Sequence, residues 1–424
     1  MIKKILFSFT IVLLVLLSAL FGYENPEKIN LTKQTIKYYA KKIGIVKEFK
    51  NIKKKITIVD NAVNIIEANS FSLEYSKVFD FSEKTAAVKI NGSKNNLNIN
   101  IYTQNGLKID NNHTVELDLP LNFTTEQRGG VKGFFKINEE EFLYISNKIK
   151  ECFYVSIYNL KRKKTLLKSK CLPTANISSI DSSVSPLLGK FIDFNGMGGA
   201  SIKFNDLILL SIGVPETESA SIRKLSQIDD SMFGKIITIR KDDLLNSNLD
   251  VVEYEIYSKG HRNPQGLVKY GNEIFSLEHG PQGGDELNRI QKGKNYGWPI
   301  VSYGTEYNDG QSYKMLNKKL YEEPVFTFIP SVATSSLKKC PSNLQKYYEN
   351  NICLIGLSLK GSSLMVFLLN KKTLNLQSYE KIIIGERLRH FGTDFENNLF
   401  VDNDFFYISA DVEGLYKLRF KDFR

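Results

Sequence analysis

The stretch from Asn351 to Asn370 reads NICLIGLSLKGSSLMVFLLN, and it decides the fold class. Two apolar runs, NICLIGL and SLMVFLLN, flank a turn that contains Lys360 and Gly361. Runs this short, rich in Ile, Leu and Val and bounded by turn residues, predict β-strands. The stretch therefore predicts two consecutive strands.

Comparable runs recur along residues 56–424, and no convincing long helical pattern interrupts them. The 27 Phe and 21 Tyr residues also favour strands. A β-sandwich of this length would be oversized, whereas six blades of about 60 residues each would make a β-propeller. No crisp repeat is visible, so we predict an all-β fold, a six-bladed β-propeller with degenerate blades. The other runs are LNINIYT, FLYISN, CFYVSIYNL, LILLSIG, KIITIRK and NLFVDND.

The formal net charge of +11 is concentrated near the N-terminus. Residues 27–55 hold ten Lys and two Glu, a net charge of +8, which leaves only about +2 for residues 56–424. A protein that binds duplex nucleic acid needs a clustered basic face on its fold. The charge distribution therefore argues against a nucleic-acid partner.

Residues 1–23 form an apolar leader with no charged residue from Ile5 to Tyr23. A run of this length can span a bilayer as a helix, and a signal peptide is the alternative. The nearest approach to a small-x-small cleavage site is Ser18-Ala19-Leu20, so we favour an uncleaved membrane anchor. The lysines that follow oppose the usual positive-inside bias, which leaves the orientation open.

Residues 24–55 are predicted to be a basic juxtamembrane helix or linker. Within them, residues 30–50 place apolar side chains at helical spacing, and lysines fill the other face. Such a helix either lies on anionic headgroups or forms a solvated stalk. The domain prediction is therefore a leader at 1–23, this tether at 24–55 and the propeller at 56–424.

Four cysteines form two local sets. Cys152 and Cys171 flank a predicted hairpin, and Cys340 and Cys353 bracket a short turn-rich segment. Locally paired cysteines suit disulfides in an oxidising compartment, and four unrelated buried thiols are the alternative. We expect a periplasmic or extracytoplasmic main domain that is membrane-anchored by its N-terminal helix.

Five segments, in order, carry a resemblance to a known family. They resemble the soluble quinoprotein glucose and aldose-sugar dehydrogenases, that is, the glucose/sorbosone dehydrogenase family, over about residues 185–420. The resemblance implies a six-bladed propeller that uses pyrroloquinoline quinone (PQQ) and calcium; residues 56–180 match only as generic propeller strands. The segments are GKIITI (234–239), GHRNPQGL (260–267), HGPQGGDELNRIQKGKNYGWP (279–299), FIPSVATSSL (328–337) with SLKG (358–361), and ERLRHFGTD (386–394).

The chemistry of these segments agrees with an acidic quinone ligand. PQQ is a planar tricarboxylate, and the arginine fork grips carboxylates in a bidentate manner. Strand alternation predicts that Arg387 and Arg389 aim into one pocket, because residues two apart share a face. The resemblance implies that Phe328 supplies an apolar wall where the family often has Trp, and that six further residues bind the cofactor. These are Arg262, Asn263, Gln265, Lys360, Arg387 and Arg389.

The glycine-rich segment after His279 suits a metal ion. Calcium prefers oxygen ligands, including backbone carbonyls. By resemblance, the carbonyls of Gly280 and Pro281 would ligate a calcium that also binds PQQ, and Asp285, Glu286 and Tyr296 would hold further calcium. A purely structural Gly-rich corner is the alternative, and Trp298 is expected to be a core anchor.

The family's catalytic histidine is missing. It stands in a segment that resembles His-(Phe/Asn)-Gly-Gly-Arg-Leu, and the corresponding stretch, DFNGMGGASIKF from Asp193 to Phe204, contains no His. None of the four His of the chain is a clear substitute, and Asp193 is the remaining candidate for a base, with a turn or strand-edge role as its alternative.

The sequence thus predicts a PQQ- and calcium-dependent oxidoreductase that oxidises an aldose sugar or related alcohol, with an unknown electron acceptor. A non-catalytic propeller that binds a carbohydrate or a partner is the second interpretation, because the family histidine is absent. A structural surface protein with a decayed pocket is the third.

Overall fold

The computed structural model describes residues 63–93, 96–110, 113–173, 192–217, 219–307, 310–314 and 320–424. The predicted leader (1–23) and tether (24–55) lie outside the described residues. Two compact units are distinguished, and the sheets that carry the site belong to the one that comprises Lys55–Asn112 and Glu116–Arg424. In the described ranges, no helix is both long and apolar enough to cross a membrane.

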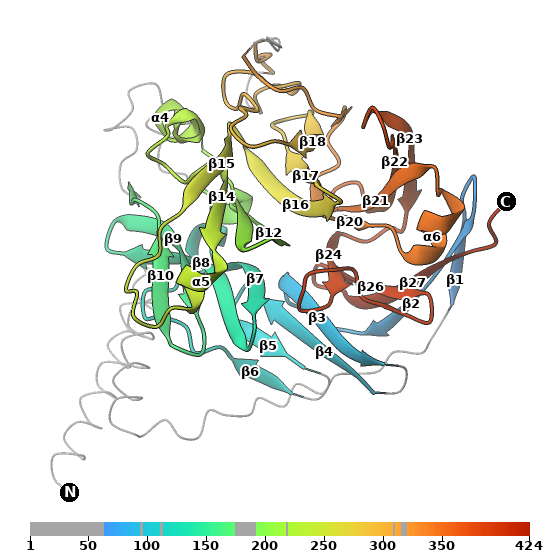
Figure 1. Ribbon diagram of the computed structural model, residues 1–424, viewed down its shortest axis with the longest axis horizontal. Coiled ribbons are helices and arrows are strands. Elements are labelled where there is room, and N and C mark those ends of the chain that lie inside the picture. Colours follow the sequence, from blue (N-terminus) through green and yellow to red (C-terminus); the bar gives the residue numbers. More distant parts are fainter. Residues whose placement is uncertain are drawn as a thin grey trace, which may run out of the picture. The chain divides into compact units, whose positions relative to one another are not determined.

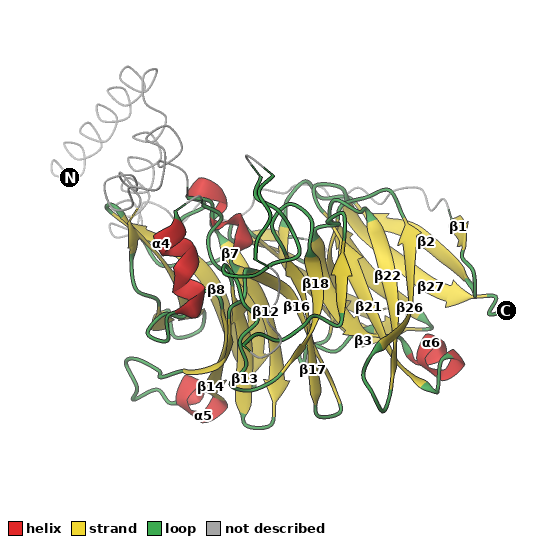
Figure 2. Cartoon of the chain, turned by 90° about the horizontal axis from the view of Figure 1, so that it is seen from above, coloured by secondary structure: helices red, strands yellow, loops and turns green. Residues whose placement is uncertain are grey.

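The all-β prediction is confirmed, because the chain runs through successive antiparallel sheets and the longest described helix, α6, has six residues (Figure 1). Figure 2 shows the short helices outside the strands, in the connections. The helices are α4 (Ala220–Arg223), α5 (Lys241–Leu245) and α6 (Ser342–Tyr347), with 3-10 turns η1 (Glu126–Arg128), η2 (Phe194–Gly196) and η3 (Lys224–Gln227).

Four sheets each use strands that are consecutive in the chain. The first consists of β7 (Val131–Ile137), β8 (Glu140–Ile149), β9 (Cys152–Asn159) and β10 (Lys164–Lys168), with β11 (Leu172–Pro173) also on β9. The second has β12 (Gly198–Phe204), β13 (Leu207–Ile212), β14 (Lys235–Arg240) and β15 (Glu255–Lys259). The third has β16 (Asn263–Tyr270), β17 (Glu273–His279), β18 (Asp285–Ile290) and β19 (Phe326–Phe328). The fourth has β20 (Thr334–Lys339), β21 (Asn351–Ser358), β22 (Ser363–Asn370) and β23 (Leu376–Ile383).

The remaining strands join the two ends of the described chain. Strand β2 pairs with β27 near the C-terminus, and β24 pairs in parallel with β3, so that Gly392 lies opposite Val88. One part of this large sheet is β24 (Leu388–Thr393), β25 (Val401–Asp402), β26 (Phe405–Ala410), β27 (Gly414–Lys421), β2 (Ser72–Phe79) and β1 (Asn64–Glu67). The other part is β3 (Thr85–Ser93), β4 (Asn96–Thr103) and β5 (Leu107–Ile109), followed along the chain by β6 (Thr114–Glu116).

The strands that open each group contact one another in sequence. Strand β3 contacts β7, β7 contacts β12, and so on through β16, β20 and β24 back to β3 (Figure 1). At these contacts the backbones approach closely: a Cβ on Gly133 of β7 would lie 2.3 Å from the carbonyl oxygen of Gly199 on β12. We call β3, β7, β12, β16, β20 and β24 the inner strands.

Each inner strand has a register shift near its start. The extra residue is Lys132 in β7, Gln265 in β16 and Arg389 in β24, and comparable shifts occur in β3, β12 and β20. A bulge of this kind bends a strand and redirects a side chain, and bulges are frequent beside functional sites. The inner strands therefore share one local irregularity at one level of the sheets.

Both predicted disulfides are confirmed. Cys152 bonds to Cys171 and Cys340 bonds to Cys353, with Cα atoms 5.3 and 5.4 Å apart. The first tethers the start of β9 to the segment that precedes β11, and the second holds the β20–α6–β21 connection. In the described ranges no cysteine is left free.

Candidate functional site

A cavity of about 590 Å³, its open mouth included, lies at the starts of β12 and β16. One wall comes from Arg262, Asn263, His279 and Pro281, all from the segments that resemble the quinoprotein family. Gly196 lies beside Asn263 and Val214 beside Arg262, and aromatic and ionic side chains complete the lining. These are Glu216, Arg223, Trp298, Glu306, Tyr307 and Tyr313.

Arg262 is one of two arginines that line the cavity, and its side chain is 13% exposed. Its guanidinium lies 5.4 Å from the ring centroid of Trp298 and 6.0 Å from that of Tyr307. The nearest carboxylate oxygen, on Glu216, is 3.9 Å away, which is a loose contact in comparison with a bidentate pair. Among the described residues, no carboxylate therefore saturates the fork of Arg262.

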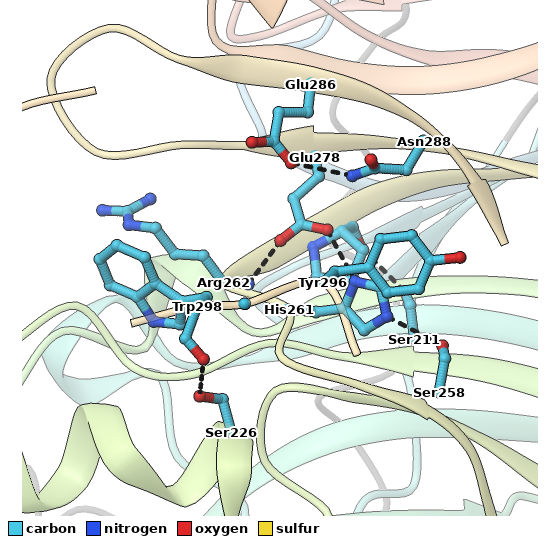
Figure 3. Close-up of polar contacts among 12 residues, drawn as sticks. Ser211, Ser226, Ser258, His261, Arg262, Glu278, Glu286, Asn288, Tyr296 and Trp298 are labelled. Atoms are coloured by element: carbon cyan, nitrogen blue, oxygen red, sulfur yellow. Dashed lines mark hydrogen bonds and ion pairs between the residues drawn. The ribbon is translucent and has the colours of Figure 1, made fainter. Parts of the chain in front are cut away.

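A buried polar relay fixes the backbone of Arg262 (Figure 3). One oxygen of Glu278 accepts a hydrogen bond from the Arg262 amide, and the other lies 2.8 Å from Nδ1 of His261. The Nε2 atom of His261 is 2.8 Å from the Ser258 hydroxyl, and its ring stacks on Tyr296. His261 is 0% exposed and has no access to the cavity, so this relay positions Arg262 and does not contact a ligand.

Asn263 and Gln265 lie beside Arg262 and tie β16 to β12. The Oδ1 atom of Asn263 accepts hydrogen bonds from the Gly198 amide (3.0 Å) and from Nε2 of Gln265 (2.8 Å). Gln265 also donates to the Gly198 carbonyl at 3.2 Å. Arg262 and Asn263 therefore line this cavity, whereas Gln265, which is bonded to Asn263, lines a second cavity.

Arg389 in β24 and Arg387, just before this strand, both lie near the carboxylate of Asp411. Arg389 is 6% exposed and forms a bidentate ion pair with Asp411, whereas Arg387 is half exposed with its Nε atom 4.0 Å from the same carboxylate. Alternation predicted one shared face, but the bulge at Arg389 breaks the alternation. His390 lines a second cavity.

Lys360 and Phe328 lie away from the cavity lining. Lys360 is exposed in the turn after β21. Phe328 is 4% exposed and packs edge-on against Phe367 and Tyr379 in the core, while the next residue, Ile329, is 68% exposed. The apolar group that projects from this loop is therefore Ile329.

Hydrogen bonds to Asp285 hold the Gly280–Pro281 turn in place. Its carboxylate accepts hydrogen bonds from the amides of Gly280, Val332 and Ala333 and from the Ser331 hydroxyl. A carboxylate with four donors is well satisfied. Asp285 thus fixes the position of the turn, and Pro281 itself lines the cavity.

The chain is similar in sequence to a known family of sugar dehydrogenases. The model of the glucose/sorbosone dehydrogenase family matches residues 192–406, just over half of the chain. The chain belongs to the glucose/sorbosone dehydrogenase family. The resemblance read from the sequence is thereby confirmed.

Individual members of the family show how far the likeness extends. The aldose sugar dehydrogenase YliI of Escherichia coli is 30% identical over 191 residues, which cover 43% of this chain and 51% of that protein. The chain spans about half the length of the curated relatives it matches.

Two solved structures share the fold. The soluble aldose sugar dehydrogenase of E. coli, in its apo-form, has a TM-score of 0.62 at 19% identity and covers 82% of this chain and 99% of its own. The PQQ-bound aldose sugar dehydrogenase of Streptomyces coelicolor has a TM-score of 0.53 at 16% identity, over 85% of this chain and 98% of its own.

The family histidine has a definable place in this structure. In the pattern His-x-Gly-Gly it precedes the two glycines by two positions, and here Gly196 precedes Gly198 and Gly199 in the same way. Gly196 ends η2 and lines the cavity. The residue that stands at the histidine position of that pattern therefore lines the cavity.

Asp193 caps η2 beside the cavity and is not part of its lining. It is 0% exposed, accepts a hydrogen bond from the Asn195 amide at 2.7 Å and forms an ion pair with Arg128. Burial raises its pKa, and these two partners oppose that shift. To act as the base, the Asp193 carboxylate would have to give up its hydrogen bond to Asn195 and its ion pair with Arg128.

Two buried polar atoms in the cavity wall lack partners. Nε2 of His279 and Nε1 of Trp298 have no hydrogen-bond partner among the described residues. An unpaired buried donor or acceptor costs about 1–3 kcal/mol, and both atoms are themselves buried in this structure. Trp298 also packs in the core against Tyr313, as its predicted anchor role requires.

Glu286 and Tyr296 face a third cavity, which also includes Glu322. Burial, and the nearby Glu278 carboxylate, raise the pKa of Glu286 to about 8. The Tyr296 hydroxyl accepts a hydrogen bond from the Gln291 amide at 3.0 Å. Over the described ranges, no group of three or more acidic, His or Cys side chains is arranged to hold a metal ion.

Sequence reasoning missed a second cavity, the channel, which the inner strands line. Three buried lysines face it, namely Lys89, Lys132 and Lys338, and its lining includes no carboxylate. Burial lowers their pKa values to about 7, 7 and 8. The three lysines stand in three different strands and share no sequence motif.

The lysine at position 89 makes the stability of the fold depend on pH. Burial and the nearby Lys338 lower its pKa from 10.5 to about 7 in the folded state. Between these values the unfolded state binds a proton that the folded state releases. The wild type should therefore gain stability relative to Lys89→Met as pH rises from 7 to 9, by at most about 1.4 kcal/mol per pH unit.

Urea unfolding of both proteins across this pH range checks the prediction. Lys381→Met, at an exposed position on β23, serves as the control and should show no such trend. Parallel stability curves for wild type and Lys89→Met would contradict the assignment of a lowered pKa to this lysine.

Proposed function

We propose that this chain is a PQQ- and calcium-dependent oxidoreductase that oxidises an aldose sugar or a related alcohol. The observation that carries the proposal is the position of Arg262, whose unsaturated guanidinium shares one cavity with Asn263, His279 and Pro281. Relatives described as aldose sugar dehydrogenases, one of them PQQ-bound, support the same reaction class.

The fold proposed for this function is a six-bladed β-propeller. Its blades would be the four consecutive sheets, the β3–β5 group and the group that β24, β26, β27 and β2 form. The contacts of the inner strands from β3 around to β24 support closure, and pairing of β2 with β27 would fasten the ends. In this arrangement the edges formed by the inner strands would face one another around the axis, where they are protected.

The described residues fit an acidic quinone. Arg262 and Arg387 would bind carboxylates, Asn263 and Gln265 would offer amide groups, and Arg389 would act with its partner Asp411. Lys360 would approach from its exposed turn, and Ile329 replaces Phe328 as the candidate apolar contact. When bound, PQQ would accept the two electrons that the substrate loses.

Calcium would bind at the carbonyls of Gly280 and Pro281. The four hydrogen bonds to Asp285 hold this turn in place without a metal ion, so the carbonyl positions are preorganised. Glu286 and Tyr296 remain candidates for further calcium in the third cavity, with Glu322 as an additional oxygen ligand.

The remaining residues would bind and orient the sugar. Trp298, Tyr307 and Tyr313 offer apolar rings, and the Arg223–Glu306 pair offers polar groups for hydroxyls. Asp193 would hold η2, and thereby Gly196, against the cavity. Without the family histidine, proton removal from the hydroxyl would lose a factor of about 10²–10⁴.

The disulfides support an extracytoplasmic location, because such bonds persist in oxidising compartments. Attachment to a membrane through residues 1–23 remains a prediction from the sequence.

Titration of the purified apo-protein with PQQ in the presence of Ca²⁺, followed by addition of aldoses and a dye acceptor, tests the proposal. We expect calorimetric binding that depends on Ca²⁺ and slow dye reduction that depends on the aldose. Absence of quinone binding would contradict the proposal.

One observation favours a second function, a non-catalytic binding propeller. Gly196 leaves the cavity without an imidazole where the family has one, while the cation and the two unpaired polar atoms remain. Quinone binding without turnover in the same titration would support this alternative.

A further inference from the structure

Lys132 occupies the same place in β7 that two of the proposed cofactor ligands occupy in their strands. It is the extra residue at the register shift between Val131 and Gly133, as Gln265 is in β16 and Arg389 is in β24. Bulged positions redirect side chains toward the interior of the site. Lys132 and Gln265 accordingly line the same channel.

The level of Lys132 along the channel is fixed by its neighbours. A Cβ on Gly199 would lie 2.0 Å from the Lys132 carbonyl oxygen, so Lys132 lies beside the start of β12. Gly198, one residue earlier, bonds to both Asn263 and Gln265. Lys132 is therefore level with the edge of the first cavity, where Arg262 and Asn263 lie.

The ammonium group of Lys132 is poorly compensated. It is 7% exposed, and its recorded hydrogen bond goes to one neutral acceptor, the Arg128 carbonyl at 2.6 Å. Among the described residues, no carboxylate lies within ion-pair distance of it. Burial and the positive charge of Arg389 lower its pKa to about 7, whereas the more distant Asp193 opposes that shift.

A structural lysine looks different in this chain. Lys235 is also fully buried, and it donates to the carbonyls of Leu225, Ser226 and Phe233 at 2.8, 2.9 and 3.0 Å. Lys89 likewise has three acceptors, Thr393, Asp394 and Asn397. Both satisfy all three N–H groups, whereas Lys132 uses one and keeps two for another partner.

The deeper lysines do not share this position. Lys89 lies opposite Thr393, four residues beyond Arg389 along β24, which is more than about 10 Å along a strand. Lys338 donates to the backbone of Asn397 at that deeper level. Lys132 is thus the one of the three channel lysines that lies level with the proposed cofactor ligands.

We infer that Lys132 is a further ligand-binding residue that contacts a carboxylate of a planar polycarboxylate at the mouth of the channel. Its ammonium would act with the positive charge of Arg389. Assignment of that carboxylate to PQQ rests on the proposed function, but the anion site itself does not. Lys132 lies outside residues 192–406, so the family match does not assign it.

Calorimetry on the full chain tests the inference with two probes, each in the presence of Ca²⁺. One is PQQ, and the other is benzene-1,3,5-tricarboxylate, a planar tricarboxylate without a quinone. Lys132→Met should weaken binding of each probe about tenfold or more, and Lys132→Arg should restore most of the affinity. Lys84→Met, at an exposed neighbouring cation, should change binding less than about threefold.

The outcomes separate the inference from the proposed function. Loss of tricarboxylate binding in Lys132→Met, with no binding of PQQ to any protein, supports the anion site and contradicts the quinone. Binding of PQQ that is unaffected by Lys132→Met overturns the inference and leaves the quinone. Failure of the wild type to bind either probe overturns both. If Lys132→Met melts at a lower temperature but binds both probes with unchanged affinity, Lys132 only stabilises the turn at Arg128. This result also overturns the inference.

Discussion

Replacement of Arg262 by leucine is expected to weaken PQQ binding about 100-fold. The guanidinium is the least compensated cation that lines the first cavity, since its nearest carboxylate oxygen is 3.9 Å away. A hydrogen bond to a charged group contributes about 1.5–3 kcal/mol, and a bidentate contact to a quinone carboxylate would provide two of them. Calorimetric titration with PQQ and Ca²⁺ measures the loss.

Two comparisons show whether this loss is specific. Arg262→Lys keeps the charge without the fork and should recover only part of the affinity. Arg289→Leu removes a partly exposed arginine whose partner is Glu273, outside the cavity lining, and should leave the affinity unchanged. Without ligand, Arg262→Leu should unfold at nearly the wild-type temperature. Glu278 bonds to the backbone amide of residue 262, and the substitution keeps this bond. Wild-type affinity in Arg262→Leu would remove the main support for the quinone site.

The middle strands of the sheets were predictable because they follow the apolar patterns of buried strands. NICLIGL and SLMVFLLN, for example, correspond to β21 and β22. The run NLFVDND yields only Val401–Asp402 as strand, because Asn403 and Asp404 have positive φ values of 49° and 66° and form a turn. Inner strands such as β12 and β20 contain small polar residues, since neighbouring backbones approach too closely for larger ones.

The site was predictable where one short segment supplies the geometry. Arg262, Asn263 and Gln265 lie together because they are neighbours at the start of one strand. Arg387, Arg389 and Lys132 depend on bulges, which alternation cannot anticipate. The resemblance predicted that Phe328 lines the cavity. Phe328 instead pairs with Asp285 in the sheet, and its ring packs in the core.

Introduction of a histidine at Gly196 is expected to raise the rate of aldose oxidation by about 10²–10⁴-fold. The position lines the cavity and matches the family histidine in the His-x-Gly-Gly pattern. A Cβ there would lie 3.5 Å from Nδ2 of Asn263 and from the Val214 carbonyl oxygen, an ordinary contact distance. A neutral imidazole at this point would accept the hydroxyl proton, as the histidine does in the resembled pattern.

Dye reduction under saturating PQQ and Ca²⁺, with calorimetry alongside, measures the gain in Gly196→His. Gly196→Ala adds the Cβ without a base, and Asn195→His places an imidazole one residue away on the same cavity wall; neither should raise the rate. If Gly196→His binds PQQ normally and turnover stays absent, the cavity does not orient an oxidisable hydroxyl, and the binding-propeller alternative gains support. If the wild type already turns over rapidly and the histidine adds nothing, another group of this wall accepts the proton. Because Asp193 is bound by Arg128 and Asn195, that result would direct attention to His279, whose Nε2 lacks a partner among the described residues.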